Sequence, residues 1–321
     1  MKLRNGKDLK PLGIRPLKLK KKEKRMYSFK TPYQQRFSLP LPTMRYIINR
    51  LINSEKSPDG WLKLIKCAKW FFSKNPILPV QFADYENGTW LASEFRSNNY
   101  LKEFEISNEN STKLWIYDGL SLYRTPYKHT LSTFLPVVYR CNLSMLFLSD
   151  QDISINEYKF LTSTGSCREI EFQTVAVKNS DGSLVTIDKL LENCDDLETF
   201  TMSFRNDSAT MFSPAAIKKL VQHLSAFNSL HKFELYEIPE TFDVRLLVDL
   251  FKKDATTAFR FYFEENISNH CKEILENFIK EVIENPPQNV PMIDFEGQDE
   301  ENYGALTELH YPSIDESDFL M

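Results

Sequence analysis

The five histidines and five cysteines have the widest choice of chemistry in this chain, because together they can ligate zinc or form a nucleophile pair. They are scattered, and His270 beside Cys271 is the only neighbouring His–Cys pair. A zinc site needs a second pair at ligand spacing, which the sequence lacks. The pattern favours ordinary buried thiols over a metal site or a Cys–His nucleophile. We therefore expect the protein to bind no metal ion and no cofactor.

Paired carboxylates offer the next possible chemistry. The doublets Asp195–Asp196 and Glu264–Glu265 precede or end expected strands, where solvated loop carboxylates explain them without acid–base catalysis. The sequence contains no Gly-x-Ser-x-Gly and no Walker loop. Only nine of the 321 residues are glycine, which disfavours an active site built from loops. We therefore expect a non-enzymatic protein with no catalytic residues.

Charge is distributed unevenly, although the net charge is only −4. Residues 1–30 hold 12 lysines and arginines against two acidic residues, and residues 294–321 hold nine acidic residues and no lysine or arginine. We interpret residues 1–37 as a basic disordered tail and residues 286–321 as an acidic, largely disordered tail. The run KLKKKEKR, 18–25, predicts nuclear import, a nucleic-acid patch or simply a solubilising arm.

The cysteines also indicate the cellular compartment in which the protein is found. Cys67, Cys141, Cys167, Cys194 and Cys271 form an odd, widely spaced set that suits a reducing compartment better than a disulfide framework. No apolar run has the length of a signal peptide or a membrane span. We expect an intracellular protein, in the cytoplasm, the nucleus or both, with no membrane partner. The five Asn-x-Ser/Thr sequons are then chance matches, at Asn87, Asn110, Asn142, Asn206 and Asn266.

Two helices are expected within a unit formed by residues 38–75. SLPLPT opens the first helix with two prolines and offers Thr43 as a possible N-cap. Pro58 and Gly60 end it, and WLKLIKCAKWFF, 61–72, forms the second helix. Apolar side chains cover too wide an arc of the second helix for a simple surface helix, which indicates more than one neighbour. The first helix has apolar residues on one face, at Met44, Ile47, Ile48, Leu51 and Ile52.

Residues 76–112 are expected to form a connecting α+β segment, and residues 113–285 an irregular strand–helix repeat. A strand over 113–123 carries Gly119 at an expected turn, and residues 130–141 read as a helix that Pro136 bends or ends. Short strands with apolar residues two apart then recur between helical patterns. The pairs are Leu114/Ile116, Leu146/Leu148, Ile170/Phe172, Phe200/Met202, Phe233/Leu235 and Phe259/Phe261.

This alternation predicts an α/β fold. An irregular leucine-rich-repeat-like α/β solenoid is favoured over a doubly wound parallel sheet, although the unit lengths vary and the strict L-x-x-L-x-L-x-x-N pattern is absent. No glycine-rich phosphate loop follows any of the strands, so the doubly wound alternative gains no nucleotide site.

The helical unit resembles the F-box motif. That family has Leu-Pro, then an apolar helix with a final leucine, then a helix ending in a Cys-x-x-Trp-like signature, and this chain has LPLPTMRYIINRL followed by CAKW at 67–70. The linker between the helices is longer than usual, and Lys66 stands where an apolar residue is usual. On this resemblance the motif positions are Leu39, Pro40, Met44, Ile47, Ile48, Leu51, Leu62, Ile65, Cys67 and Trp70.

A wider resemblance, over most of residues 38–285, is to the large nematode family of F-box-containing proteins. The segments LPLP, FFSKNPILPV, FLTSTG and VTIDKLLENC carry it. It implies a substrate-recognition adaptor of a cullin–RING (SCF-type) ubiquitin ligase. Residues 38–72 would bind the small linker subunit of the ligase, and the repeat region would bind an unknown target protein.

Residues that alternate with the core pairs are the candidates for target binding: Glu171, Thr201, Glu234 and Arg260. An ordinary solvated face explains them equally well. Two other functions stay open, namely an interaction scaffold without a ligase link, in which residues 38–72 cap the repeats, and a nucleus-directed nucleic-acid binder that depends on the basic run. The mixed charge of the repeat region disfavours nucleic acid as a partner.

Overall fold

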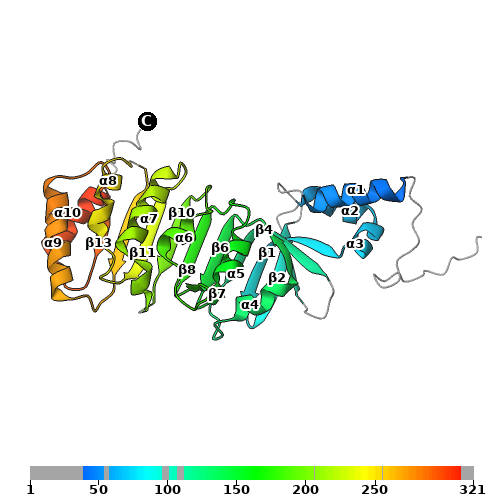
Figure 1. Cartoon of the computed structure of the whole chain (residues 1–321), viewed down its shortest axis with the longest axis horizontal. Coiled ribbons are helices and arrows are strands. Elements are labelled where there is room, and N and C mark those ends of the chain that lie inside the picture. The colour runs from blue at the N-terminus through cyan, green and yellow to red at the C-terminus, as the bar shows by residue number, and fades with distance from the viewer. Residues whose placement is uncertain are drawn as a thin grey trace, which may run out of the picture.

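The structure, a computed structural model, describes residues 39–53, 58–95, 101–106, 112–205, 207–254 and 256–311. Within these residues the fold is mixed α/β, as expected: three short helices precede a large, mostly parallel sheet of 11 strands. The molecule is elongated, with α1–α3 at one end and α9 and α10 at the other (Figure 1). Within the described ranges, no helix combines the length and apolar character that a membrane span requires.

The N-terminal helices are α1 (Leu41–Ile52), α2 (Asp59–Cys67) and α3 (Lys69–Lys74). Helix α1 starts earlier than expected: Pro40 occupies the N-cap position, Pro42 lies in the first turn and Thr43 is inside the helix rather than capping it. The single helix expected over 61–72 is broken at Ala68, which is extended (φ −148°, ψ 114°).

Residues 76–112, expected as a connecting segment, instead supply three strands of the main sheet: β1 (Ile77–Glu86), β2 (Thr89–Phe95) and β3 (Leu101–Glu105). Strands β1, β2 and β3 form antiparallel pairs, and β1 also lies parallel to β4 (Lys113–Leu122). Gly119, expected at a turn, lies inside β4. A side chain there would overlap the ring of Phe82 on β1, so glycine is needed for close packing rather than for a turn.

From β4 onward the parallel strands follow one another across the sheet in chain order. They are β6 (Met145–Ser149), β8 (Glu169–Gln173), β10 (Thr199–Ser203), β11 (Lys232–Ile238), β12 (Ala258–Phe263) and β13 (Met292–Asp294). β5 (Val138–Cys141) pairs with the first half of β4, beside β6. A separate two-stranded sheet joins β7 (Asp152–Ser154) to β9 (Ala176–Lys178).

Helices connect these strands and cover one face of the sheet (Figure 1). They are α4 (Thr130–Phe134), η1 (Leu135–Val137), α5 (Ile155–Leu161), α6 (Ile187–Leu191), η2 (Ser208–Met211), α7 (Pro214–Ala226), η3 (Val244–Leu247), α8 (Val248–Phe251) and α9 (Asn269–Glu284). Ser213 caps α7 and Pro214 is its first residue, as the sequence predicts. The helix expected over 130–141 ends in the short η1 turn that contains Pro136, after which β5 begins.

The apolar strand pairs meet in two buried rows beneath these helices, because successive strands are in register. One row is Leu120, Leu146, Ile170, Phe200, Phe233 and Phe259, and the other is Leu122, Leu148, Phe172, Met202, Leu235 and Phe261. All are at most 1% exposed. Leu114 and Ile116, the expected first pair, are also buried, but they pair with β5 and lie outside the two rows.

The backbone repeats at the strand ends as well. The carbonyl oxygens of Ser144, Arg168 and Glu198 each accept hydrogen bonds from two consecutive N–H groups of the next unit. In the described part of the chain, four non-glycine residues have a left-handed φ of 52–55°, each two positions after an inward apolar residue and near the end of a strand. They are Arg124, Asp150, Thr174 and Glu237. This conformation is unfavourable for side chains other than glycine, so its recurrence marks a shared backbone geometry at the ends of β4, β6, β8 and β11.

The C-terminal region corrects one expectation. Residues 286–321 were expected to be largely disordered, yet β13 adds a strand beside β12, and α10 (Glu300–His310) packs against α9 and β13. Met292, Ile293 and Leu306 are at most 3% exposed, and this burial outweighs the acidic composition. Residues 312–321 lie outside the described residues, as do residues 1–38 with the basic run 18–25.

Candidate functional site

Helices α1–α3 have a small hydrophobic core of their own. Met44, Ile48 and Ile52 form one stripe along α1, because they are four residues apart. Trp61 of α2, Phe71 of α3 and Ala68 between the two helices pack against this stripe, and Ile77 and Trp115 join them from the sheet. Two sheet residues therefore complete this core and attach the helical unit to the rest of the chain.

The ten motif residues divide by exposure. Met44 and Ile48 are buried in this core, whereas the other eight are partly or largely accessible. The half-buried residues are Ile47, Leu51, Leu62, Ile65 and Trp70, and the exposed residues are Leu39, Pro40 and Cys67. The structure thus brings the ten positions into one helical unit and gives them different surroundings.

Two exposed apolar residues, Leu41 and Tyr46, lie outside the ten motif positions, although the Leu41–Pro42 pair competes with Leu39–Pro40 for the register of the motif. Leu41 is 45% exposed and Tyr46 is 60% exposed, and both lie on α1; Leu39, just before the helix, is 48% exposed. The guanidinium of Arg50 lies 5.5 Å from the centre of the Tyr46 ring, and its Nε donates to the Tyr46 hydroxyl. The sequence feature that could have indicated this exposed surface is the second Leu-Pro pair, Leu41–Pro42. Large apolar side chains outside a completed core are typical of a protein-binding surface.

The four target-binding candidates lie in one row on the face of the sheet opposite the helices, which we call the open face. Ile170 and Phe172 point toward the helices, so Glu171 between them points to the open face. Pairing places Thr201 beside Glu171, Glu234 beside Thr201 and Arg260 beside Glu234. The structure therefore brings together four residues that are up to 89 positions apart in the sequence.

Two members of this row are already engaged with each other. Glu234 is 2% exposed and accepts from Arg260 Nη1, from Lys232 Nζ at 2.8 Å and from the Tyr236 hydroxyl at 3.2 Å. Burial alone would raise the pKa of Glu234, but the hydrogen bonds from Lys232 and Arg260 hold it below its ordinary value. This carboxylate is satisfied within the chain.

The C-terminal end of α10 borders Arg260. Tyr311 lies with its ring centre 5.3 Å from the Arg260 guanidinium, and Arg260 Nε is 3.5 Å from His310 Nε2. His310 Nδ1 lies 2.6 Å from the Val290 carbonyl oxygen, which fixes Nδ1 as the protonated nitrogen. Burial and the nearby Arg260 lower the pKa of His310. Arg260 and Glu234 are therefore less available to a partner than Glu171 and Thr201.

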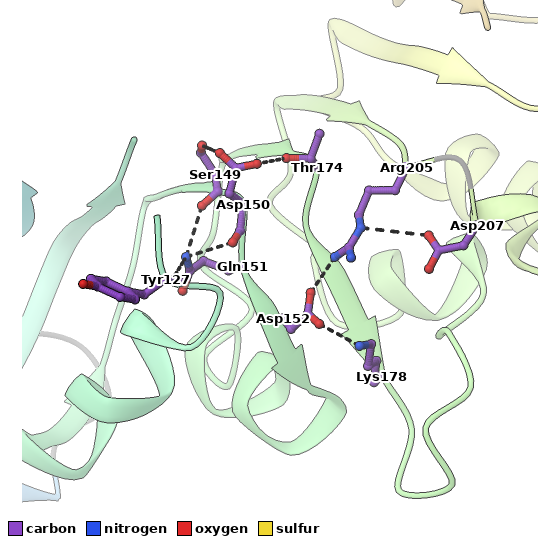
Figure 2. A network of polar contacts seen from close by, with 9 residues as sticks. All are labelled: Tyr127, Ser149, Asp150, Gln151, Asp152, Thr174, Lys178, Arg205 and Asp207. Carbon is purple, nitrogen blue, oxygen red and sulfur yellow. Dashed lines mark hydrogen bonds and ion pairs between the residues drawn. The ribbon is translucent and has the colours of Figure 1, made fainter. Parts of the chain in front are cut away.

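A polar network joins the loops that follow β6, β8 and β10 (Figure 2). Asp152, whose side chain is 12% exposed, accepts from Lys178 Nζ at 2.7 Å and from Arg205 Nη1 at 2.5 Å. Arg205 also lies 4.0 Å from the exposed Asp207. Burial alone would raise the pKa of Asp152, but the hydrogen bonds from Lys178 and Arg205 lower it. This cluster could not be predicted from the sequence, because Asp152, Lys178 and Arg205 are 26 to 53 residues apart.

The same network includes a fully buried amide. The Gln151 side chain donates to the carbonyl oxygens of Tyr127 and Asp150, each at 3.1 Å, and accepts from the backbone N–H of Leu131. Beside it, Asp150 accepts from the Thr174 hydroxyl at 2.5 Å (Figure 2). Ligands often bind at this edge of α/β sheets. Here the polar groups are partners for one another, so the network holds loops in place.

In the described part of the chain, histidine, cysteine, aspartate and glutamate side chains could hold a metal ion, and cysteines could act as thiol nucleophiles. No group of three His, Cys, Asp or Glu side chains there is arranged to hold a metal ion. All five cysteines are free, and three are buried. Burial raises the pKa of Cys141 to about 12 and that of Cys194 to about 11, so both stay protonated at neutral pH. His270 is exposed at the start of α9, beside the half-buried Cys271.

Comparison with known proteins leaves the family open. No protein-family model matches the chain, and no curated protein matches it significantly.

Proposed function

We propose that this chain is a non-enzymatic substrate-recognition adaptor of a cullin–RING (SCF-type) ubiquitin ligase, found inside the cell. Residues 38–72 bind the small linker subunit of the ligase, and the open face of the sheet binds a target protein. The observation that carries this proposal is the helical unit, whose core is completed by Ile77 and Trp115 of the sheet while Leu39, Leu41 and Tyr46 stay between 45% and 60% exposed.

The sequence pattern supports the same assignment. The Leu-Pro start, the apolar stripe of α1 and the Cys67-x-x-Trp70 spacing resemble an F-box. Such a unit has to pack on its own chain and also bury apolar side chains in a partner. The break at Ala68 separates Cys67 from Trp70 and departs from a simple second helix.

We also propose that residues 113–285 form an irregular leucine-rich-repeat-like solenoid, which β13 extends. Its strands run across the sheet in chain order from β4 to β13, its inward residues are in register, and its backbone repeats at the strand ends. A doubly wound sheet places helices on both faces. A solenoid leaves one face open, and repeat proteins commonly bind partners with such a surface.

The second candidate is an interaction scaffold with no ligase link, in which α1–α3 only cap the sheet. The hydrogen bond from Trp61 Nε1 to the carbonyl oxygen of Ile77 favours it, since this bond anchors the unit as a cap would be anchored. The two candidates differ in whether the exposed apolar residues of α1 bind the linker subunit.

Co-purification with the linker subunit tests the proposal. We would compare the wild-type chain with Leu39→Asp plus Leu41→Asp, which changes exposed residues at the start of α1. Aspartate is favourable near a helix N-terminus, so this variant should fold. The matched control is Leu246→Asp plus Leu309→Asp, two leucines 36% exposed elsewhere. Ile47 and Leu51 are less suitable because both are half-buried.

We expect the wild type and the control to retain the linker subunit and the α1 variant to lose it. Circular dichroism would establish that all three proteins are folded. A folded wild type that fails to bind the linker subunit would refute the adaptor and leave the scaffold.

A further inference from the structure

The open face has two unlike parts. Toward β12, Lys232, Glu234 and Arg260 form ion pairs with one another, and the end of α10 borders them. Toward β4, the outward residues include Tyr123, Met145 and Phe147 together with Glu169 and Glu171. The first part is a completed internal network, so a partner would gain little by contacting its charges.

Two carboxylates in the second part form no ion pair within the described part of the chain. Glu169 and Glu171 are two residues apart on β8 and point to the same face. Neither takes part in an ion pair among the residues that the structure describes, and the polar contact of Glu171 is with the amide of Gln173 at 2.8 Å. Two like charges at this spacing repel, and a cation placed between them would be attracted by both.

Apolar groups lie directly beside these carboxylates. Register places Met145 next to Glu169 and Phe147 next to Glu171. The rings of Phe147 and Tyr123 are stacked with centres 6.2 Å apart. Burial, followed by the charges of Glu171 and Glu169, raises the pKa of Tyr123 to about 12, so the carboxylates act on the same surface as the aromatic rings.

We propose that Tyr123, Met145, Phe147, Glu169 and Glu171 form the docking surface for an extended target segment that carries lysine or arginine next to an apolar side chain. The cation pairs with the two carboxylates, and the apolar side chain packs on Phe147 and Met145. The proposal rests on the proposed use of the open face for target binding, and it does not depend on the linker subunit.

The C-terminal region of this same chain is excluded as the occupant by the sign of its charge. Residues 294–321 contain nine acidic residues and no lysine or arginine, so the C-terminal region would be repelled by Glu169 and Glu171. The basic run 18–25 has the favourable sign, and the experiment has to separate it from a target in trans.

A random dodecapeptide display library selected on the immobilised full chain tests the proposal, with affinities of the recovered peptides measured by fluorescence anisotropy. We expect peptides enriched in lysine or arginine beside apolar residues. Glu169→Gln plus Glu171→Gln should weaken their binding at least tenfold, and Phe147→Ala severalfold. The charge-matched control, Glu273→Gln plus Glu281→Gln, changes exposed residues of α9 and should bind within twofold of the wild type.

Peptides without basic residues, no recovered peptides, or equal affinity for the Glu169/Glu171 variant would overturn the proposal. So would peptides that bind only after Lys20, Lys21, Lys22 and Lys24 are changed to glutamine in the full chain, because the basic run would then be the natural occupant. The Glu169/Glu171 variant should still co-purify with the linker subunit as the wild type does. Failure of peptide binding and failure of linker binding are thus read separately.

Discussion

The indole Nε1 of Trp61 donates a 2.9 Å hydrogen bond to the backbone carbonyl oxygen of Ile77, and no part of Trp61 is exposed. Ile77 is the first residue of β1, so the helical unit is tied to the sheet where the chain enters it. A second tie runs through Arg140, which donates to the carbonyl oxygen of Ile52 at 3.3 Å and stacks on Trp115. Through these contacts, α1–α3 and the sheet share one packed interface.

Trp61→Phe tests this tie. The substitution removes the N–H donor and leaves a small void, so we expect the free energy of unfolding to fall by about 1–3 kcal/mol. Urea denaturation followed by circular dichroism would measure it. Trp70→Phe is the control, because Trp70 is half-buried and its ring meets Phe71 edge-on. An equal or larger loss in the Trp70 variant would contradict the anchoring role of Trp61.

Gly119→Ala probes the packing between β1 and β4. A Cβ at Gly119 would overlap the Phe82 ring, so we expect a loss of about 1–3 kcal/mol in unfolding free energy. The loss should shrink in a Phe82→Ala background, which makes room for the added methyl group. Gly304→Ala on α10 meets nothing within 4 Å and should stabilise the chain by about 0.5–1 kcal/mol. Equal effects at the two glycines would contradict the proposed packing.

Six parallel strands were predictable from the sequence, because each carries apolar residues two apart: β4, β6, β8, β10, β11 and β12. What could not be predicted is which part of β4 lies in register with β6. Leu114/Ile116 and Leu120/Leu122 show the same alternation within one long strand, and only the pairing with β5 and β6 separates them. The break of the helix at Ala68 could not be predicted for a related reason. Trp61, Ala68 and Phe71 lie on one face of an unbroken helix as well as in the observed core.

The candidate site was predictable in part. Alternation along single strands placed Glu171, Thr201, Glu234 and Arg260 on a common face. Their unequal availability could not be predicted, because it depends on contacts such as that of Arg260 with His310, 50 residues away. Composition also misled at the C-terminus, where the three residues of β13 are too short a run to outweigh the surrounding acidic residues.

Leu306→Ala tests whether α10 is part of the folded chain. Leu306 is fully buried, and its truncation should cost about 2–4 kcal/mol of unfolding free energy. Leu309→Ala, three residues along the same helix, removes a side chain that is 36% exposed and should cost less than about 1 kcal/mol. Thermal or urea denaturation would measure both. Two small and similar losses would mean that α10 does not stabilise the fold in solution.

Asp152→Asn tests the network of Figure 2 and its dependence on pH. The pKa of Asp152 is lowered in the folded chain, so its charge stabilises the fold above the ordinary pKa of about 3.9. That stabilisation is lost as pH falls through the lowered value. We expect the variant to be less stable than the wild type by about 1–3 kcal/mol at pH 7, since Lys178 and Arg205 lose a charged acceptor.

The difference in stability between the wild type and Asp152→Asn should therefore shrink on acidification below about pH 4. Urea denaturation at a series of pH values would measure it. Asp207→Asn is the control, because Asp207 is 64% exposed and lies 4.0 Å from Arg205, where an exposed ion pair contributes little. A difference for Asp152 that stayed constant between pH 7 and pH 3 would show that hydrogen bonding of a neutral side chain, rather than its charge, holds these loops together.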